Sequence, residues 1–260
     1  MRGSIIQGET RGQVVVQVVE HKTRKVYAQD FYNGMKESER PCVSSLLKGK
    51  LGSQKITLDA LHLIPETVKQ IEKQKGVFLV GIKENQKELL EEVQFITTNQ
   101  KSISELIQSQ KEHGRIDSRT YTAYNANDGC FEQRWDAANF QTVIRVERKS
   151  YNCKNKKQSV ETSYYISNQK IKPVKNDVEL FEAIRGHWNV ETNNYIRDVT
   201  FKEDDLITKE PLIAMSMATC RTVLLNLIYQ LNLKNIRAKL EEFADNFQIL
   251  VHWLAQIKFL

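Results

Sequence analysis

Two carboxylates, Glu191 and Asp59, occupy positions at which an acidic side chain could do metal chemistry. Glu191 lies in AIRGHWNVETNNY, residues 183–195. If this segment is helical, Glu191 shares one face with four apolar or aromatic residues spaced three or four apart, namely Phe181, Ile184, Trp188 and Tyr195. That face should pack against a core, where a lone ionised carboxylate needs a positive partner or a raised pKa. An ion pair with nearby Arg185 or His187 is the structural alternative.

Asp59 is the last residue of KITLD, a short segment with the composition of a β-strand. Open α/β sheets place ligand and catalytic groups at the carboxyl ends of their strands. A turn or helix-capping role before LHLIPET is the structural alternative. Mg²⁺ prefers oxygen ligands, and two carboxylates from distant parts of a chain can supply them. The two acids therefore predict a divalent-metal site to which Asp59 and Glu191 both contribute, and the metal would neutralise Glu191.

Composition and charge narrow the class of protein. The chain has 260 residues, 40% of them hydrophobic, with a net charge of +6 and a pI near 9.0, a balance that favours polyanionic partners. No apolar run of about 18 residues and no signal-like amino terminus is present, so we expect a cytoplasmic protein with no membrane partner. The four cysteines are scattered without the spacing of zinc ligands and should be free thiols. Cys220 is predicted to be a small core residue on an apolar helix.

The first 100 residues alternate between strand and helix patterns. Period-two alternation and short apolar runs predict strands at 13–21, 25–32, 55–60 and 77–83. Period-3.6 patterns predict helices near 39–49, 66–76 and 85–99. This order indicates a mainly parallel sheet with helices on its faces.

The second half begins with a change of character. Strand-like segments with basic loops predict a β-rich insertion at about 110–170, before the helix that contains Glu191. An apolar helix at about 209–231 and an amphipathic one near 235–246 follow. Since no flexible linker is evident, residues 1–260 are predicted to form a single domain.

Several segments taken together resemble a known family. In order, they are KITLDALH, VFLVGIKENQKELLEEV, EHGRIDSRTY, TVIRVERK with TSYYIS, and AIRGHWNVETNNYIRDVTFKEDD. Their order and spacing resemble the DDE transposases of insertion sequences, in the H-repeat-associated group. The resemblance runs from Arg2-Gly3-Ser4 to about residue 231, and HGR, IRGHW-N-V-E and DVTF-ED are its most specific parts.

The resemblance implies an α/β, RNase H-like fold: a mixed sheet with helices on both faces and a helical carboxyl terminus. It also implies an Asp-Asp-Glu triad with two Mg²⁺ ions, which drive in-line attack on a phosphodiester. Asp59 matches the second Asp and Glu191 the Glu. Arg185 and His187 would contact DNA phosphates, and Lys83 would line the site, although a turn or cap role is open for Lys83. The implied partners are insertion-sequence ends and target DNA, with a possible homodimer.

The sequence departs from the family in two places. The family's first Asp belongs to a D-G-K-T-L-R-G-S type segment on the central first strand, whereas this chain reads MRGS, so that Asp and that strand are expected to be absent. We therefore expect impaired strand cleavage and two unpaired strand edges. The alternative function is a non-catalytic DNA-binding or dimerising remnant that interferes with an intact transposase. ETNNYIRDVTF also reads one residue short, which would rotate Asp198 and the acids after it by about 100°.

Overall fold

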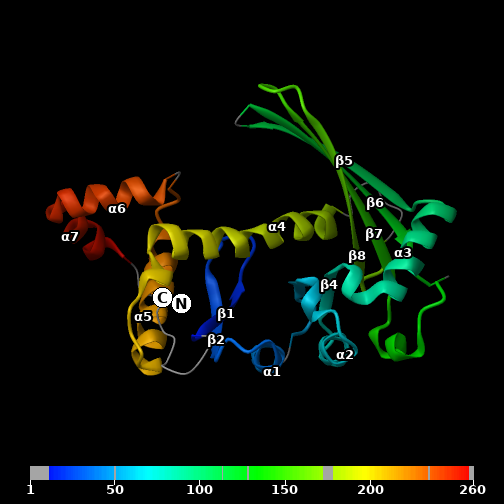
Figure 1. The fold of residues 1–260 in the computed structure, drawn as a ribbon, viewed down its shortest axis with the longest axis horizontal. Coiled ribbons are helices and arrows are strands. Elements are labelled where there is room, and N and C mark those ends of the chain that lie inside the picture. The colour runs from blue at the N-terminus through cyan, green and yellow to red at the C-terminus, as the bar shows by residue number, and fades with distance from the viewer. Residues whose placement is uncertain are drawn as a thin grey trace. The chain divides into compact units, whose positions relative to one another are not determined.

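The computed structural model describes residues 12–49, 51–112, 114–127, 129–171, 178–233 and 235–257. Arg2-Gly3-Ser4, where the family resemblance begins, lies outside these ranges, as does the His of the HGR motif. The chain divides into two compact units, Met1–Leu46 with Trp188–Leu260 (unit 1) and Leu47–His187 (unit 2). The long helix α4, Val178–Tyr195, contributes residues to both units (Figure 1).

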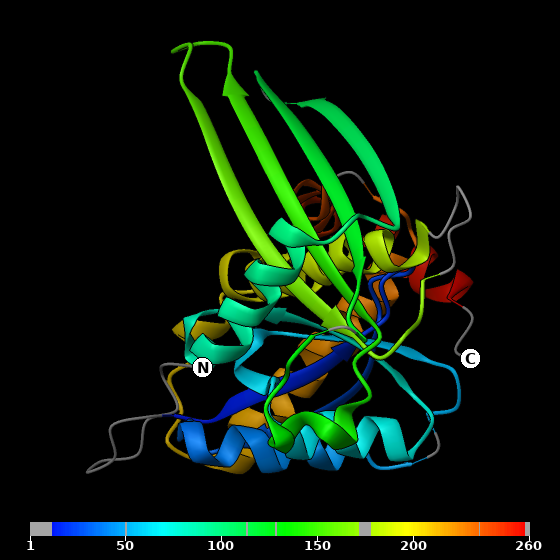
Figure 2. The same cartoon turned by 90° about the vertical axis from the view of Figure 1, so that its right-hand side faces the viewer.

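Unit 2 is built on a six-stranded sheet with the strand order β3-β4-β8-β7-β6-β5. The strands are β3 (Lys55–Leu58), β4 (Val77–Ile82), β5 (Ser104–Glu112), β6 (Arg115–Asn125), β7 (Thr142–Asn152) and β8 (Gln158–Ser167). The helices are α2 (Pro65–Lys73), α3 (Lys87–Asn99) and the first part of α4, with 3-10 turns at Ala60–His62, Glu84–Gln86 and Gln133–Ala138. The four long strands β5 to β8 run side by side in Figure 2.

The sheet is mixed, because β3 and β4 are parallel and every other neighbouring pair is antiparallel. The prediction of a mainly parallel sheet was therefore wrong. The reason is the segment after α3, where four successive strands pair with their neighbours in the chain. Short turns join β5 to β6 and β7 to β8, a longer connection with a 3-10 turn joins β6 to β7, and all three pairs are antiparallel. This mixed sheet, the helices and the helical carboxyl terminus confirm the predicted α/β class and are consistent with an RNase H-like fold.

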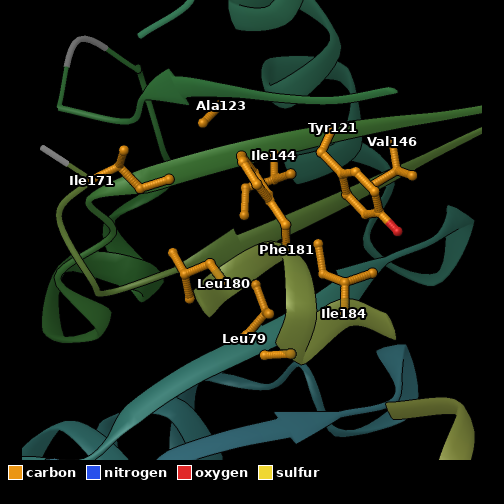
Figure 3. Packing of buried hydrophobic residues seen from close by; sticks show 10 residues of the cluster. Leu79, Tyr121, Ala123, Ile144, Val146, Ile171, Leu180, Phe181 and Ile184 are labelled. Carbon is orange, nitrogen blue, oxygen red and sulfur yellow. The ribbon is translucent and has the colours of Figure 1, made fainter. Parts of the chain in front are cut away.

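The core of unit 2 lies between the sheet and the first part of α4. Its buried side chains come from three strands (β4, β6 and β7), the segment after β8 and the helix: Leu79, Tyr121, Ala123, Ile144, Val146, Ile171, Leu180, Phe181, Ala183 and Ile184 (Figure 3). The rings of Tyr121 and Phe181 lie 5.3 Å apart between centroids. Alternation along the strands places these residues on one face of the sheet.

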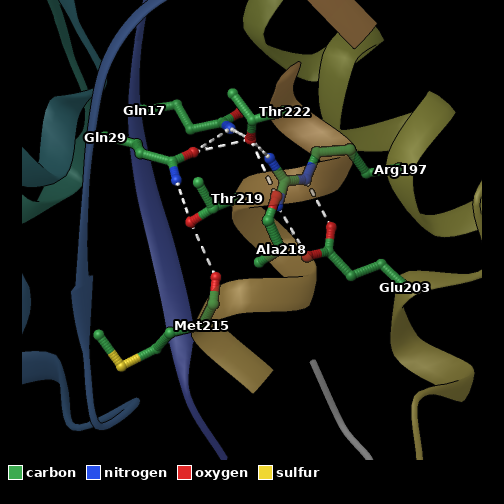
Figure 4. A network of polar contacts seen from close by, with 8 residues as sticks. All are labelled: Gln17, Gln29, Arg197, Glu203, Met215, Ala218, Thr219 and Thr222. Carbon is green, nitrogen blue, oxygen red and sulfur yellow. Dashed lines mark hydrogen bonds and ion pairs between the residues drawn. The ribbon is translucent and has the colours of Figure 1, made fainter. Parts of the chain in front are cut away.

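Unit 1 combines a two-stranded antiparallel hairpin with helices. Its elements are β1 (Val14–Val19), β2 (Val26–Tyr32), α1 (Lys36–Leu46), the second part of α4, a π-helical turn (Ile196–Thr200), a 3-10 turn (Glu203–Asp205), α5 (Pro211–Tyr229), α6 (Ile236–Asp245) and α7 (Phe247–Gln256). A buried ion pair, Arg197 Nε to Glu203 Oε2 at 2.5 Å, lies beside Thr222 of α5, which accepts from Arg197 and donates to Gln29 (Figure 4). Glu203 therefore has a charged partner despite the apparent one-residue deletion.

By length and composition alone, α5 is the one described helix that could cross a membrane. It also carries polar contacts with the hairpin: Asn226 accepts from the N–H of Val26 and donates to the carbonyl of the same residue. These contacts are those of a helix packed within a globular unit.

Cys220 on α5 is exposed, so its predicted core position was wrong, and all four cysteines are free as expected.

Each sheet has two edge strands with one neighbour only among the described residues: β3 and β5 in the six-stranded sheet, and β1 and β2 in the hairpin. The resemblance places the family's first strand between β1 and β3. The expectation that this strand is absent stays a prediction.

Candidate functional site

Asp59 directly follows β3 and is fixed by its backbone surroundings. Its carboxylate caps the 3-10 turn Ala60–His62, since Oδ1 accepts from the N–H of Ala60 at 2.7 Å. Asp59 follows Lys55 and Thr57 in alternation, so these three residues point to one side of the strand. The side chain is 61% exposed, which leaves the carboxylate open to a ligand.

Lys83 meets Asp59 because β3 and β4 are parallel neighbours that end at the same edge of the sheet. The ammonium Nζ of Lys83 lies 3.2 Å from Asp59 Oδ1. Asn85, in the turn after Lys83, donates to the carbonyl of Ala60 at 3.0 Å. The turn after β4 is thereby tied to the turn after β3.

His187 is the third predicted residue at this place. Its Nδ1 lies 2.9 Å from the hydroxyl of Thr57, two residues before Asp59. An ion pair between Lys55 and Glu179 holds the beginning of α4 to the same strand. Three of the five predicted site residues, Asp59, Lys83 and His187, therefore gather at the carboxyl end of β3.

The electrostatics of the cluster favour the ionised carboxylate. Partial burial, the largest single effect, raises the pKa of Asp59, but the hydrogen bonds from Ala60 and Lys83 and the charges of Lys83 and His187 together lower it below its ordinary value. Asp59 is therefore an anion at neutral pH with two basic side chains beside it. Such a group can accept a proton or a cation, and its basic neighbours can contact a phosphate.

Arg185 has a different neighbour. Its guanidinium donates to the side-chain oxygen of Gln110 on β5 at 2.5 Å. The alternative of an ion pair with an acid of its own helix does not occur in the described ranges. Arg185 is thus held toward the long strands of the sheet.

Glu191 lies in unit 1 and is exposed. Of the predicted stripe, Phe181 and Ile184 are buried, but Trp188 is 59% exposed and Tyr195 63%. The interpretation of Glu191 as a carboxylate in a buried apolar face was therefore wrong for this half of the helix, as was the core assignment of Trp188. An exposed carboxylate needs no buried partner.

Two asparagines of the second part of α4, the half-buried Asn189 and the buried Asn193, bind the turn between β1 and β2. Asn189 donates to the carbonyl of His21 at 2.7 Å, and the buried Asn193 donates to the carbonyl of Arg24 at 2.9 Å. These residues are four apart, and at 100° per residue they lie on the side of the helix away from Glu191. Sequence reasoning missed them, although two asparagines at this spacing are a signal for a helix that binds irregular backbone.

The expected magnesium centre requires both carboxylates. No group of three His, Cys, Asp or Glu side chains that could hold a metal ion is present within the described ranges. Asp59 belongs to unit 2 and Glu191 to unit 1, so their convergence stays a prediction. Among the residues that the structure describes, neither unit alone brings together the ligands that a two-metal centre needs.

The fold and the cluster define an α/β protein, consistent with an RNase H-like fold, that carries an acid and two basic side chains at the carboxyl end of a strand. No protein-family profile matches the chain. Over 189 residues it is 27% identical to "Putative protein YbfL" and 26% identical to "H repeat-associated putative transposase YhhI", both of Escherichia coli (strain K12). Each match covers 70% of this chain and 48% of the relative, so the chain spans about half the length of these curated relatives. The similarities support a transposase-like family.

Proposed function

We propose that the chain belongs to the machinery of DNA transposition and binds insertion-sequence ends, with Asp59 and Glu191 as acidic residues of a DDE-type site. Lys83, His187 and Arg185 would contact DNA phosphates. Mg²⁺ is the cofactor that the resemblance implies, and a homodimer is its implied assembly. Strand cleavage and transfer would be the activity of the intact family.

One observation carries this proposal: Asp59, Lys83 and His187 gather at the carboxyl end of β3, where the resemblance independently places a catalytic Asp. A capping residue alone would need no second basic neighbour. The net charge of +6 and the similarity to YhhI support a polyanionic partner.

A second candidate is a non-catalytic DNA-binding protein that interferes with an intact transposase. The printed sequence contains no D-G-K-T type segment, which would supply the first Asp. The described residues also contain no three-ligand group for a metal. Binding of this kind needs only basic side chains such as Lys83, His187 and Arg185, and the net charge of +6 supports it.

The two candidates separate in a nicking and binding assay. The substrate is a labelled duplex that contains an end of the element from which the gene comes, with Mg²⁺ or EDTA. Mg²⁺-dependent nicking that is lost in D59N and E191Q supports catalysis, and Glu182→Gln on the exposed side of α4 is the matched control. Salt-sensitive binding without nicking supports the second candidate. Absence of binding at low salt contradicts both.

A further inference from the structure

Unit 2 contains a polar cavity whose residues differ from those of the Asp59 cluster. It has a volume of about 370 Å³ and is lined by Gln108, Ser109, Gln110, Arg119 and Arg185. The first three come from β5, Arg119 from β6 and Arg185 from α4. Two arginines and two side-chain amides face one volume.

The position of Arg119 follows from the pleat of β6. Tyr121 and Ala123 pack in the core beneath α4, and Arg119 precedes Tyr121 by two residues, so it points to the same face. On the neighbouring strands Gln108 and Arg148 lie directly opposite Arg119. Two arginines opposite one another on adjacent strands repel, which destabilises the pair unless an anion compensates.

The carboxylates of this region are already engaged. Asp117 lies 3.0 Å from Arg115 and 3.4 Å from Arg148, and Glu161 lies 3.9 Å from Arg148. Hydrogen bonds from Ser150 and Arg148 outweigh the effect of burial and lower the pKa of Asp117, so it is ionised and serves those arginines. Asp117 and Glu161 are thus paired with Arg115 and Arg148, and neither forms an ion pair with Arg119 or Arg185.

Arg119 has no direct ion pair, and the charge of Asp117 favours its protonated form less than burial and the neighbouring arginines disfavour it. Its guanidinium makes no hydrogen bond or ion pair within the described ranges, and Arg185 binds only the neutral Gln110. Burial, and then the positive charges of Arg185 and Arg148, lower the pKa of Arg119, although a guanidinium stays protonated at neutral pH. A partly buried, unpaired cation beside a second cation is an arrangement that an anion would stabilise.

We infer that this cavity binds a phosphate-type oxyanion between Arg119 and Arg185, with the amides of Gln108 and Gln110 as further donors. Guanidinium groups suit this role because their planar fork binds two phosphate oxygens at once. In the DNA-binding protein proposed above, the anion is a phosphate of the DNA backbone, and this part of the inference rests on the proposed function.

The anion site is tested by thermal unfolding in inorganic phosphate and in chloride of the same ionic strength. Phosphate should raise the melting temperature of the wild type by about 3 °C at a tenfold excess over Kd. R119Q and R185Q should lose this excess shift, whereas K69Q, which removes an exposed charge on α2, should keep it. R119Q should also melt higher than the wild type in chloride, because it removes a repulsion. Equal phosphate shifts in the wild type, R119Q and R185Q overturn the inference.

The source of the anion is tested by duplex binding as a function of salt. If a DNA phosphate occupies the cavity, R119Q and R185Q should each reduce the slope of log K against log salt by about 1. The double variant should lose no more than either single variant, because both arginines bind one phosphate. If the salt slopes of the variants equal that of the wild type while phosphate still raises the melting temperature, the cavity binds free phosphate and not a DNA phosphate. The proposed DNA binding is then unaffected. Absence of duplex binding rejects the proposed function, while the phosphate arm still decides the anion site.

Discussion

Of the two roles that the sequence left open for Asp59, the structure shows the capping role, and the role in binding a ligand stays a prediction. It caps the turn after β3, which is the structural alternative, and it also lies 3.2 Å from Lys83 and close to His187. The contacts with Ala60 and Lys83 are both made by Oδ1 of Asp59. Its Oδ2 receives no hydrogen bond from the described residues. A capping aspartate is therefore compatible with a ligand-binding one, and the cap fixes the direction of its carboxylate.

The lowered pKa of Asp59 predicts a pH-dependent contribution to stability. The folded pKa lies below that of the unfolded chain, about 3.9, so the contribution is complete above that value and is lost as the pH falls through the folded pKa. Because the side chain is 61% exposed, the effect should be at most about 1 kcal/mol. Urea unfolding should show D59N less stable than the wild type at pH 7 and equal to it near pH 2.

Lys83 supplies the control for this prediction. In a Lys83→Gln background the difference between Asp59 and D59N at pH 7 should shrink, because the ammonium is one cause of the lowered pKa. Asparagine can still accept from Ala60, so the cap itself is retained. A wild-type advantage of the same size at pH 7 and pH 2 would show that the charge of Asp59 contributes nothing.

At the scale of elements, α4 explains why the sequence pattern misled. The stripe of Phe181, Ile184, Trp188, Glu191 and Tyr195 is continuous in the sequence. In the structure its first two members are buried in unit 2, and its last three are exposed. A periodic pattern assumes that one face stays buried along a helix, and α4 does not satisfy that assumption.

This change of burial predicts that two aromatic truncations on one helix differ strongly in their effect on stability. Phe181 is 2% exposed and packs on Tyr121, so F181A should cost about 3–5 kcal/mol of unfolding free energy. Trp188 is 59% exposed, and W188A should change stability by no more than about 0.5 kcal/mol. Urea denaturation followed by circular dichroism measures both. A loss in W188A as large as that in F181A would place Trp188 in a core.

Most elements were predictable because burial imposes a period on their sequences. The alternation in β6 and β7 and the short apolar run of β4 indicated strands close to those observed. β5 was missed because SELIQSQKE has few apolar residues and is largely exposed. α7 was not predicted, although Gln248, His252 and Gln256 are four apart in FQILVHWLAQ and mark one polar face of a helix.

The site was predictable only in part. The carboxyl end of a strand located Asp59, and the parallel pairing of β3 and β4 then brings Lys83 to it. Arg119 could not be found in this way, because its importance depends on which strands become its neighbours. Strand order and register are non-local, and one sequence does not reveal them.

At the scale of the whole molecule, the β-rich segment is part of the same sheet as β3 and β4 rather than a separate layer. Whether residues 1–260 form a single catalytic domain stays a prediction, since the chain comprises two compact units. The predicted convergence of Asp59 and Glu191 involves both units, so it has to be tested on the whole chain.

Manganese binding provides that test, because Mn²⁺ takes the oxygen ligands of Mg²⁺ sites and is detected by electron paramagnetic resonance. If Asp59 and Glu191 share an ion, D59N and E191Q should each weaken Mn²⁺ binding at least about tenfold. The double variant should then be little weaker than either single variant, since the coupling of residues at one site makes their effects non-additive. E182Q, an exposed acid on the same helix, should bind as the wild type does. Additive losses in the double variant, or a separate Mn²⁺ lost with each substitution, would show that the two carboxylates serve different places.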